Sequence, residues 1–454
     1  MGLLYLLLGE ILGTNTLAPT IGAIYLYTFV PLQLNKLKMK EKLSNVISES
    51  GIWKDNRSSS HAFLLSPSVY AISEVQHEEL KKLGFSLYDC LIGLSRIACI
   101  ACSNDLNYRG AWQLIRRVFN TGVPKVYQEL QSLNPNHIPR LLKVDLMLDE
   151  SGNFKIAEID GHNKHGLGYS TLGLRFRESL YPESKSMIGV VKELSKELNR
   201  HGSDVIKIFY ADRERFYLPE FEIAQQEFKK HGIDCLVVSE LDATLEFTQS
   251  GIFLDLPFLN KNIELYDSII DSYKKGKVKF VIPPKPFLGS KGVLALLRND
   301  SKDTHLESIL NSFIKESSLE LLRSYIPETY LIGKEIVNKM PMDAKVWKKN
   351  FVLKESISSG MKGIYFSDQE GFTTVLDKAF KAKMNWILQE EVVNQPQSFS
   401  WYDSGKELNK ANNWFMRVTT HYVNRNLADI IVTARRNKAV HGAKDCLQLG
   451  AIIT

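Results

Sequence analysis

The sequence predicts an α/β protein with a helical N-terminal region, two β-rich regions and a βαβ domain inserted between them. Three stretches carry this prediction. LLKVDLMLDESGNFKIAEID, residues 141–160, alternates apolar and polar residues on both sides of a turn, as a β-hairpin does. Residues 203–240 follow the order strand, amphipathic helix, glycine, strand. Residues 350–454 contain a further series of alternating strands joined by short loops.

The composition is that of a folded protein and narrows the class of partner. Of the 454 residues, 44% are hydrophobic and 24% are charged, which suits two to four domains with sizeable cores. The net charge of +6 is a weak bias that suits anionic ligands, and no nucleic-acid-binding motif is evident. Five cysteines form no disulfide framework, and the pair Cys99–Cys102 lacks a second pair to complete a zinc site. We therefore expect a cytoplasmic protein with no nucleic-acid partner.

We expect five segments along the chain. Residues 1–38 are apolar, 39–138 are helical, 139–202 contain the hairpin, 203–290 form the βαβ domain, and 291–454 are β-rich. A short strand is also expected at 262–270, NIELYDSII. The apolar start has two interpretations that stay open. Residues 1–35 are a weak membrane anchor followed by lysines, or the natural start is Met39.

Two acids end the second strand of the hairpin. Glu158 and Asp160 are two residues apart, so an extended strand points them the same way, ~7 Å from each other. Two carboxylates on one face are costly unless a cation lies between them, and Mg²⁺ prefers oxygen ligands. Asn163 adds a neutral oxygen from the next loop, whose His162 and His165 lack zinc-ligand spacing. The pattern indicates a candidate magnesium site, and the alternative is a solvated strand end.

A lysine followed by a Ser- and Gly-rich loop is the second candidate feature. Lys354 closes the strand FVLK, and the loop after it contains Ser358, Ser359, Gly360 and Gly363. Backbone N–H groups of such a loop can contact phosphate oxygens because few β-carbons block the approach. The alternative is an ordinary hairpin loop with a surface lysine, and the loop does not have the Walker spacing.

Polar residues also end two later strands. NWILQEEVV places Gln389, Glu390, Glu391 and Val392 where a strand leaves the core, so backbone groups could meet an adenine edge and a carboxylate a ribose. Basic residues end or line the following strands, namely Arg417, Arg435, Arg436 and Lys438. Such a cluster would neutralise charge as a phosphoryl group moves, and a basic surface ridge is the alternative.

The order of these pieces resembles a circularly permuted ATP-grasp ligase, and in particular eukaryotic-type glutathione synthetase, with glutathionylspermidine synthase as a relative. The matching stretches are KVDLMLDESGNFKIAEIDGHN, KIFYADRERFYLPEFEIAQQEFKKHGIDCLVV, FLGSKGVLALL, FVLKESISSGMKGIYF, WILQEEVV and ARRNK. Together they cover about residues 140–454. The resemblance implies a carboxylate–amine ligase that uses ATP and Mg²⁺ and forms an acylphosphate. Small-molecule carboxylate and amine substrates and a homodimer follow from the same resemblance.

The resemblance also assigns residues. The implied nucleotide-binding residues are Lys291, Lys354, Ser358, Ser359, Gly360, Gly363, Gln389, Glu390, Glu391, Val392 and Lys438. The implied metal ligands are Glu158, Asp160 and Asn163, and the implied catalytic residues are Arg436 and Arg417.

Three positions depart from the family pattern. Asp160 stands where the family has Asn, Lys143 where it has Arg, and Ser358 where the lid carries a third metal-binding Glu. Two alternatives therefore stay open, an ATP-grasp phosphotransferase and a nucleotide-binding protein without turnover.

Overall fold

A computed structural model describes residues 38–46, 63–103, 110–185, 187–199, 205–258, 262–333, 350–358, 363–402, 408–442 and 445–454. The predictions for residues 1–37 and for Ser359 and Gly360 of the predicted lid lie outside these residues.

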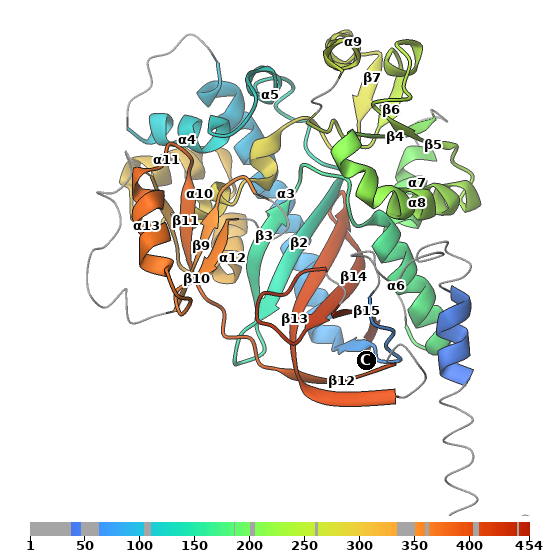
Figure 1. Cartoon of the computed structure of the whole chain (residues 1–454). Helices are drawn as coiled ribbons and strands as arrows, with labels where there is room; N and C mark the ends of the chain where they lie inside the picture. Colours follow the sequence, from blue (N-terminus) through green and yellow to red (C-terminus); the bar gives the residue numbers. More distant parts are fainter. Residues whose placement is uncertain are drawn as a thin grey trace, which may run out of the picture.

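A seven-stranded sheet forms the middle of the molecule (Figure 1). Its strands in spatial order are β1 (Tyr70–Ile72), β15 (Cys446–Ile453), β14 (Asn426–Arg435), β13 (Leu408–Val423), β2 (Leu141–Leu148) and β3 (Phe154–Asp160), and β12 (Gln397–Tyr402) pairs with β13. All these pairs are antiparallel except β1 with β15. The predicted hairpin of residues 141–160 is therefore confirmed, and it lies beside the last strands of the chain.

Each face of this sheet has its own partner because side chains alternate along a strand. Leu142, Val144 and Leu146 of β2 are buried in the same core as α3 (Glu74–Ala101). Ser73 caps the start of α3 through a capping box with Gln76. By length and hydropathy α3 could cross a membrane, but two thirds of its most apolar stretch is buried inside the protein. It serves here as a core helix, as the sequence predicted for its cysteines.

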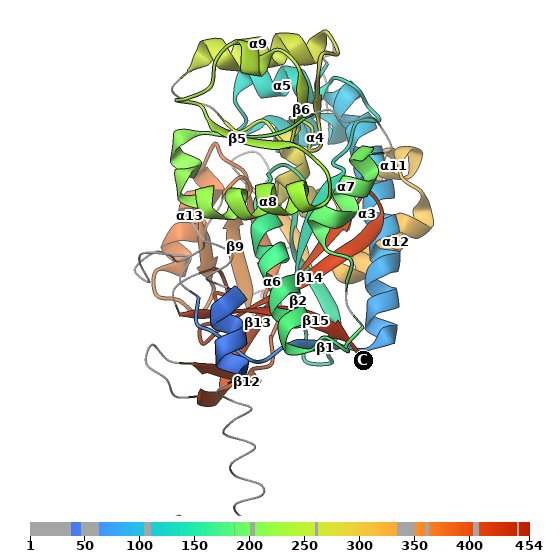
Figure 2. The ribbon, with the colours of Figure 1, turned by 90° about the vertical axis from the view of Figure 1, so that its right-hand side faces the viewer.

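The opposite face of the sheet carries α6 (Leu167–Leu180), as Figure 2 shows. Glycines in both elements allow α6 to pack closely against β15. A β-carbon on Gly450 of β15 would lie 2.6 Å from the carbonyl oxygen of Gly173 in α6. The helix of residues 38–46 packs Leu43 and Val46 against the outer side of α6. The remaining helices of this region are α4 (Ala111–Asn120), α5 (Lys125–Gln131), α10 (Gly292–Arg298), α11 (Thr304–Phe313) and α12 (Glu316–Tyr325).

A second, four-stranded antiparallel sheet lies on the left in Figure 1. Its strands in spatial order are β10 (Ile364–Phe366), β9 (Phe351–Glu355), β11 (Trp386–Glu390) and β8 (Thr329–Ile332). The helix α13 (Phe372–Lys381) covers it and shares its apolar core. The strands predicted at FVLK and NWILQEEVV are confirmed as β9 and β11.

The third sheet is parallel and lies at the top right in Figure 1. Its strands in spatial order are β5 (Cys235–Ser239), β4 (Ile206–Tyr210), β6 (Gly251–Phe253) and β7 (Val278–Phe280). Its helices are α7 (Val190–Asn199), α8 (Leu218–Lys230) and α9 (Ile263–Lys274), with short 3₁₀ turns η1 (Asp212–Tyr217) and η2 (Glu246–Thr248). The predicted strand–helix–strand unit is thus β4–α8–β5.

One predicted strand is wrong, because residues 262–270 begin helix α9. The side chain of Asn262 accepts a hydrogen bond from the N–H of Leu265, as an N-cap does. Leu265, Ile269 and Tyr273 are buried at intervals of four residues, which is the spacing of a helix face.

Candidate functional site

The polar face of the main sheet brings residues from distant parts of the chain into rows. Strand pairing sets Glu158 opposite Asp145, and Asp145 opposite Thr419. The neighbouring row, ~7 Å away, is Asp160, Lys143 and His421. A third row, on the other side of the first row, contains Arg417 opposite Thr433. Residues of the hairpin and of the C-terminal strands therefore share one surface.

A large cavity of about 760 Å³ opens above these rows. It is bounded by the polar sheet face, by the loop after β3, by η1 and the end of β6, and by Ile357 and Ser358 after β9. Its volume is in the range of small-molecule sites. The charged residues among its lining are Lys143, Asp145, Glu158, Asp160, Arg213, Glu214, Asp255, Lys285 and Arg417.

Two of the predicted lysines, Lys291 and Lys354, contact the hairpin beside this cavity, although neither of them lines it. Lys291, the residue before α10, places its Nζ 3.0 Å from Oε1 of Glu158 and 3.0 Å from the carbonyl oxygen of Ser358. Lys354 of β9 donates a hydrogen bond of 3.1 Å to the carbonyl oxygen of Ala157, the residue before Glu158. The acid and the two lysines therefore converge from three separate segments, as the sequence predicted.

Lys354 is buried, and burial has an electrostatic consequence. Loss of hydration lowers its pKa from 10.5 to about 8, although the nearby carboxylate of Glu158 acts in the opposite direction. Its Nζ also donates to Oε1 of Gln389 at 2.6 Å, and the amide of Gln389 donates to Thr329. No carboxylate within the described part of the chain forms an ion pair with Lys354, so an anionic ligand would find an unneutralised cation there.

Lys438 lies on the same face of the second sheet as Lys354, because it contacts Phe366, which shares that face, and acids surround it. Its Nζ contacts the carboxylates of Glu391 and Asp368 and lies 4.5 Å from the ring centre of Phe366. Burial opposes protonation, but these two hydrogen-bonded carboxylates outweigh it and raise the pKa of Lys438. Lys438 and Glu391 are therefore neighbours, as expected for one end of a nucleotide site. Glu390 and Val392 flank Glu391 at the end of β11.

The predicted metal ligands lie in two different environments. The carboxylate of Glu158 is 31% exposed and faces Asp145, whose side chain is 21% exposed. Asp160 instead forms an ion pair with Lys143 at 2.8 Å and accepts a hydrogen bond from the amide of Asn163. Burial alone would raise the pKa of Asp160, but Lys143 and His162 hold it well below its usual value.

This arrangement fits a metal at Glu158 better than at Asp160. The oxygen of the Asn163 amide accepts from Lys143 and from the N–H of His165, so it is turned away from a metal. Among the described residues, no group of three His, Cys, Asp or Glu side chains is arranged around one point. Oxygen donors from Glu158 and Asp145 suit Mg²⁺, which commonly uses one or two carboxylates and takes its remaining ligands from phosphates and water.

Glu355, which follows Lys354, does not supply a third ligand. Neighbouring residues of a strand point to opposite faces, and Lys354 faces the hairpin. The side chain of Glu355 packs beside Gly363, where φ is +70° and a β-carbon would lie 2.8 Å from Cβ of Glu355. Gly363 and Ser358 thus mark the two described ends of the predicted lid.

The two predicted arginines are placed differently. Arg417 lines the cavity, and its guanidinium lies 3.3 Å from a carboxylate oxygen of Asp145. Arg436 is not among the residues that line the cavity, and its guanidinium lies 4.4 Å from the ring centre of Trp401 and 5.0 Å from that of Trp414. The structure therefore brings Arg417, and not Arg436, to the candidate site.

The other half of the cavity contains an ion cluster that the sequence analysis missed. Lys164 is fully buried, and its Nζ lies 3.0 Å from Glu214 and 3.1 Å from Asp255. Nε2 of His165 lies 3.3 Å from Glu214. Burial raises the pKa of Asp255 to about 6 and lowers that of His165 to about 4. Glu214 and Asp255 follow the carboxyl ends of the parallel strands β4 and β6, which is where such sheets place ligand-binding residues.

His421 forms part of the floor of this half. It is 1% exposed, lines the cavity, and neither ring nitrogen hydrogen-bonds to the described chain. Burial, with Lys143 nearby, lowers its pKa to about 3, so the imidazole is neutral. Gly166, with φ of +107°, allows this packing, because a β-carbon there would lie 3.0 Å from Nε2 of His421.

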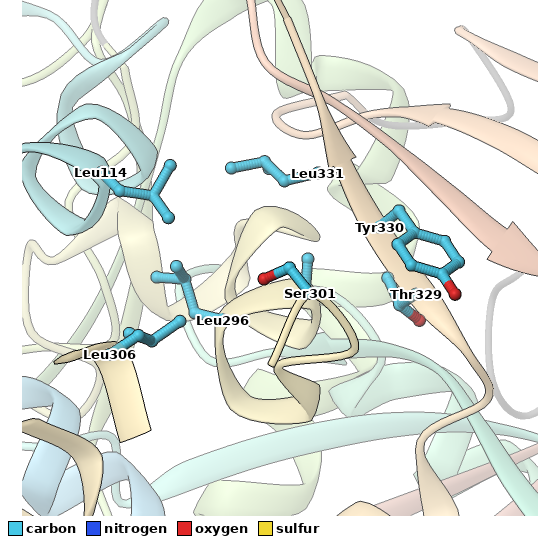
Figure 3. A pocket seen from close by; sticks show the side chains of 8 residues that line it. Leu114, Leu296, Ser301, Leu306, Thr329, Tyr330 and Leu331 are labelled. Carbon is cyan, nitrogen blue, oxygen red and sulfur yellow. The ribbon is translucent and has the colours of Figure 1, made fainter. Parts of the chain in front are cut away.

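A small separate cavity is a packing void. Figure 3 shows Leu114, Leu296, Leu306 and Leu331 around it, with Thr329 and Tyr330 at one side. Its volume of about 20 Å³ is enough for one water molecule and too small for an organic ligand.

Comparison of the sequence with protein-family models and with curated proteins found no match. Comparison of the structure with solved structures found matches, of which one is described first. It is a glutathione synthetase-like effector (GSS30) from Globodera pallida in its apo form, with a TM-score of 0.54 and 11% sequence identity, covering 93% of this chain and 97% of that chain. The fold is glutathione synthetase-like.

A second structure is a candidate gamma-glutamylcysteine synthetase from Methylobacillus flagellatus KT, with a TM-score of 0.36 and 10% identity over 80% of this chain and 88% of that one. That likeness is too distant to support an argument. At these identities, the glutathione synthetase-like fold is established but the reaction is not. The circular permutation stays a prediction.

Proposed function

We propose that this protein is an ATP- and Mg²⁺-dependent carboxylate–amine ligase of circularly permuted ATP-grasp architecture. ATP would phosphorylate a substrate carboxylate, and an amine would attack the acylphosphate to form an amide and release phosphate. The observation that supports this most directly is the 3.0 Å contact of Lys291 with Glu158 beside the buried, unneutralised Lys354. A triphosphate between the lysines and the acid would satisfy both lysines, provided that a divalent cation joins it to the acid.

The lysines would bind and orient the phosphates. Lys354 and Lys291 come from separate segments and contact the hairpin at Ala157 and Glu158, so a phosphoryl group that met both would be held at two points. Lys438, Gln389 and Glu391 would hold the rest of the nucleotide against β9 and β11. The loop from Ser358 to Gly363 would cover the phosphates and exclude water, which would otherwise hydrolyse an acylphosphate.

Glu158 and Asp145 would hold the magnesium ion, and Asp160 and Asn163 would support them from the neighbouring row. Magnesium would supply a positive charge that neutralises the phosphoryl oxygens during transfer. Arg417 would add a second cation at the same place, because its ion pair with Asp145 fixes it at the cavity wall. Arg436 stays a predicted acid-binding residue for which the described contacts offer no support.

Hydroxylamine trapping tests the proposal. With Mg-ATP, hydroxylamine and a panel of carboxylic acids, a ligase forms a hydroxamate and releases one ADP for each. ADP release with phosphorylation of a hydroxyl acceptor and no hydroxamate would indicate the phosphotransferase alternative. Tight Mg-ATP binding with no ADP release for any acid and amine tested would indicate a nucleotide-binding protein without turnover. The cytoplasmic location, the homodimer and membrane association through residues 1–35 stay predictions beside this one.

A further inference from the structure

Aromatic side chains line much of the large cavity, and the proposed mechanism assigns no role to them. Six contribute to the wall, namely Phe63, Tyr127, Tyr169, Phe216, Tyr217 and Phe258. Tyr127 is buried, whereas the other five are partly accessible, and Phe216 is 48% exposed. A ligand that covered these rings would remove apolar surface from water, which favours binding.

Contacts between rings fix the positions of these side chains. Phe216 and Tyr217 of η1 meet edge to face, with ring centres 5.0 Å apart. The ring of His165 lies 3.9 Å from that of Tyr217, also measured between centres. Phe258, which follows β6, lies edge to face with Tyr127 at 4.6 Å. A wall that is already ordered loses little conformational freedom when a ligand binds to it.

A third pair of rings includes a residue of the N-terminal region, which the family resemblance does not cover. Phe63 lies edge to face with Tyr169, in the first turn of α6, with ring centres 5.5 Å apart. The chain that carries Phe63 is fixed to the main sheet, because the N–H of Leu64 donates to the carbonyl oxygen of Cys446 in β15. The aromatic wall therefore combines the chain before β1, the start of α6, η1 and the loop after β6.

The charged groups beside these rings have partners within the protein. Lys164 forms ion pairs with Glu214 and Asp255. The guanidinium of Arg213 lies 5.9 Å from the ring centre of Phe258, as cations do on aromatic faces. The chemistry of this wall therefore favours a ligand body that is aromatic rather than charged.

We propose that the acid substrate of the ligase carries an aromatic body, which binds against Phe216, Tyr217 and Phe258. Its carboxylate would lie elsewhere in the same cavity, where Glu158 and Arg417 line the wall. Rings of the substrate and of the wall would pack offset or edge to face. The cavity volume of about 760 Å³ is large enough for such an acid beside the terminal phosphate of ATP. This inference rests on the proposed function and adds the class of substrate.

The rings are assigned to the acid and not to the amine because of where each substrate must react. Phosphoryl transfer requires the carboxylate of the acid beside Glu158 and Arg417, so the rest of the acid extends into the remaining cavity, whose wall includes η1. The amine has only to reach the activated carbon afterwards and needs no place at the phosphates.

Hydroxamate formation by the full chain, with Mg-ATP, hydroxylamine and matched pairs of acids, tests the inference. Phenylacetate is compared with acetate and hydrocinnamate with propionate, and glutarate serves as an acid with a charged body. We expect kcat/KM for each aromatic acid to exceed that of its aliphatic partner about tenfold or more, because the ring leaves water on binding. The difference should lie mainly in KM, since the rings touch the body of the acid and not its carboxylate.

Two exposed phenylalanines provide a matched pair of variants. Phe216→Ala should lower the preference for aromatic acids about threefold or more, because one ring of the wall is lost. Phe85→Ala removes a ring that is 51% exposed on α3 and does not line the cavity, so it should change the preference less than about twofold. Phe258→Leu is the second variant should Phe216→Ala fail to fold, as judged by its thermal unfolding.

Three results overturn the inference while the ligase reaction stands. They are equal use of aliphatic acids or glutarate, a preference that Phe216→Ala and Phe258→Leu both leave intact, and an aromatic preference for the amine alone, tested with benzylamine and ethylamine.

Calorimetric titration with phenylacetate and acetate, without ATP, separates this inference from the proposed function. No hydroxamate from any acid, combined with saturable binding of phenylacetate that Phe216→Ala weakens, would contradict the ligase reaction and support the aromatic site. Neither hydroxamate nor binding of phenylacetate would contradict both.

Discussion

Nucleotide binding should cause the protein to take up a proton, and Lys354 is the group that we expect to accept it. Burial lowers the pKa of this lysine from 10.5 to about 8, so at pH 8 about half of the molecules carry it neutral. A phosphate oxygen about 4 Å away contributes about 4 kcal/mol at the effective dielectric of a protein site. That equals about three pKa units, which is enough to protonate Lys354 fully. We expect uptake of about half a proton per nucleotide at pH 8.

The pH dependence has a definite sign. A lysine with a lowered pKa in the free protein is already protonated well below pH 8, so uptake should fall to about one tenth of a proton at pH 7 and rise to about nine tenths at pH 9. Calorimetric titration with a non-hydrolysable ATP analogue and Mg²⁺ measures this uptake. The heat is compared in two buffers of different ionisation enthalpy, and the slope gives the number of protons.

Two variants make the assignment specific. Lys354→Met should remove the uptake, whereas Lys378→Met, at an exposed lysine of α13 in the same lobe, should retain it. Nucleotide that binds with no buffer dependence at pH 8 would refute the reasoning, because Lys354 would then be charged before binding or would not meet the phosphates. Absence of any nucleotide binding would instead contradict the proposed function.

Three further outcomes are expected. Glu158→Ala should lose most of the thermal stabilisation by Mg-ATP in a thermal-shift assay. Glu355→Ala should keep it, because Glu355 points to the face of β9 opposite to Lys354. Equal losses in the two variants would contradict the assignment of Glu158 as a metal ligand. Lys164→Met should lower the free energy of unfolding by about 3–5 kcal/mol in urea denaturation, since Glu214 and Asp255 would be left buried without their cation. A loss under about 1 kcal/mol would show that water reaches these two acids. Gly166→Ala should cost about 1–3 kcal/mol by the same measurement, and more than Gly152→Ala, which also has positive φ but has open space around it.

The sequence was sufficient to predict the local elements and the chain segments of the site. The hairpin of residues 141–160, the strands at FVLK and WILQE and the start of α10 after Lys291 follow from alternation and turn residues, which act over a few neighbours. The strand predicted at 262–270 failed because apolar spacing in a short window suits a strand and a helix alike. Asn262 was the available signal, as an N-cap immediately before the apolar residues.

The orientation of individual side chains was beyond the sequence. Asp160 was predicted beside Glu158 as a metal ligand because both face the same way, and the rows of the sheet confirm that they do. Its partner Lys143 comes from the opposing strand, and strand register decides such a pair rather than residue spacing. The ion cluster around Lys164 likewise joins residues 50 and 91 positions apart, which no local pattern encodes.

The neighbouring arginines at the end of β14 show how one residue of register changes a chemical assignment. Ile431 and Thr433 line the cavity, so by alternation Arg435 continues that face and Arg436 leaves it. Arg435 contacts His441, which lines the cavity, whereas Arg436 lies on two tryptophans. The family resemblance assigns Arg436 to the substrate. Alternation along β14 instead puts Arg435, one position earlier, on the face of the cavity. The register of β14 against β13 therefore puts Arg435, and not Arg436, on the face that borders the cavity.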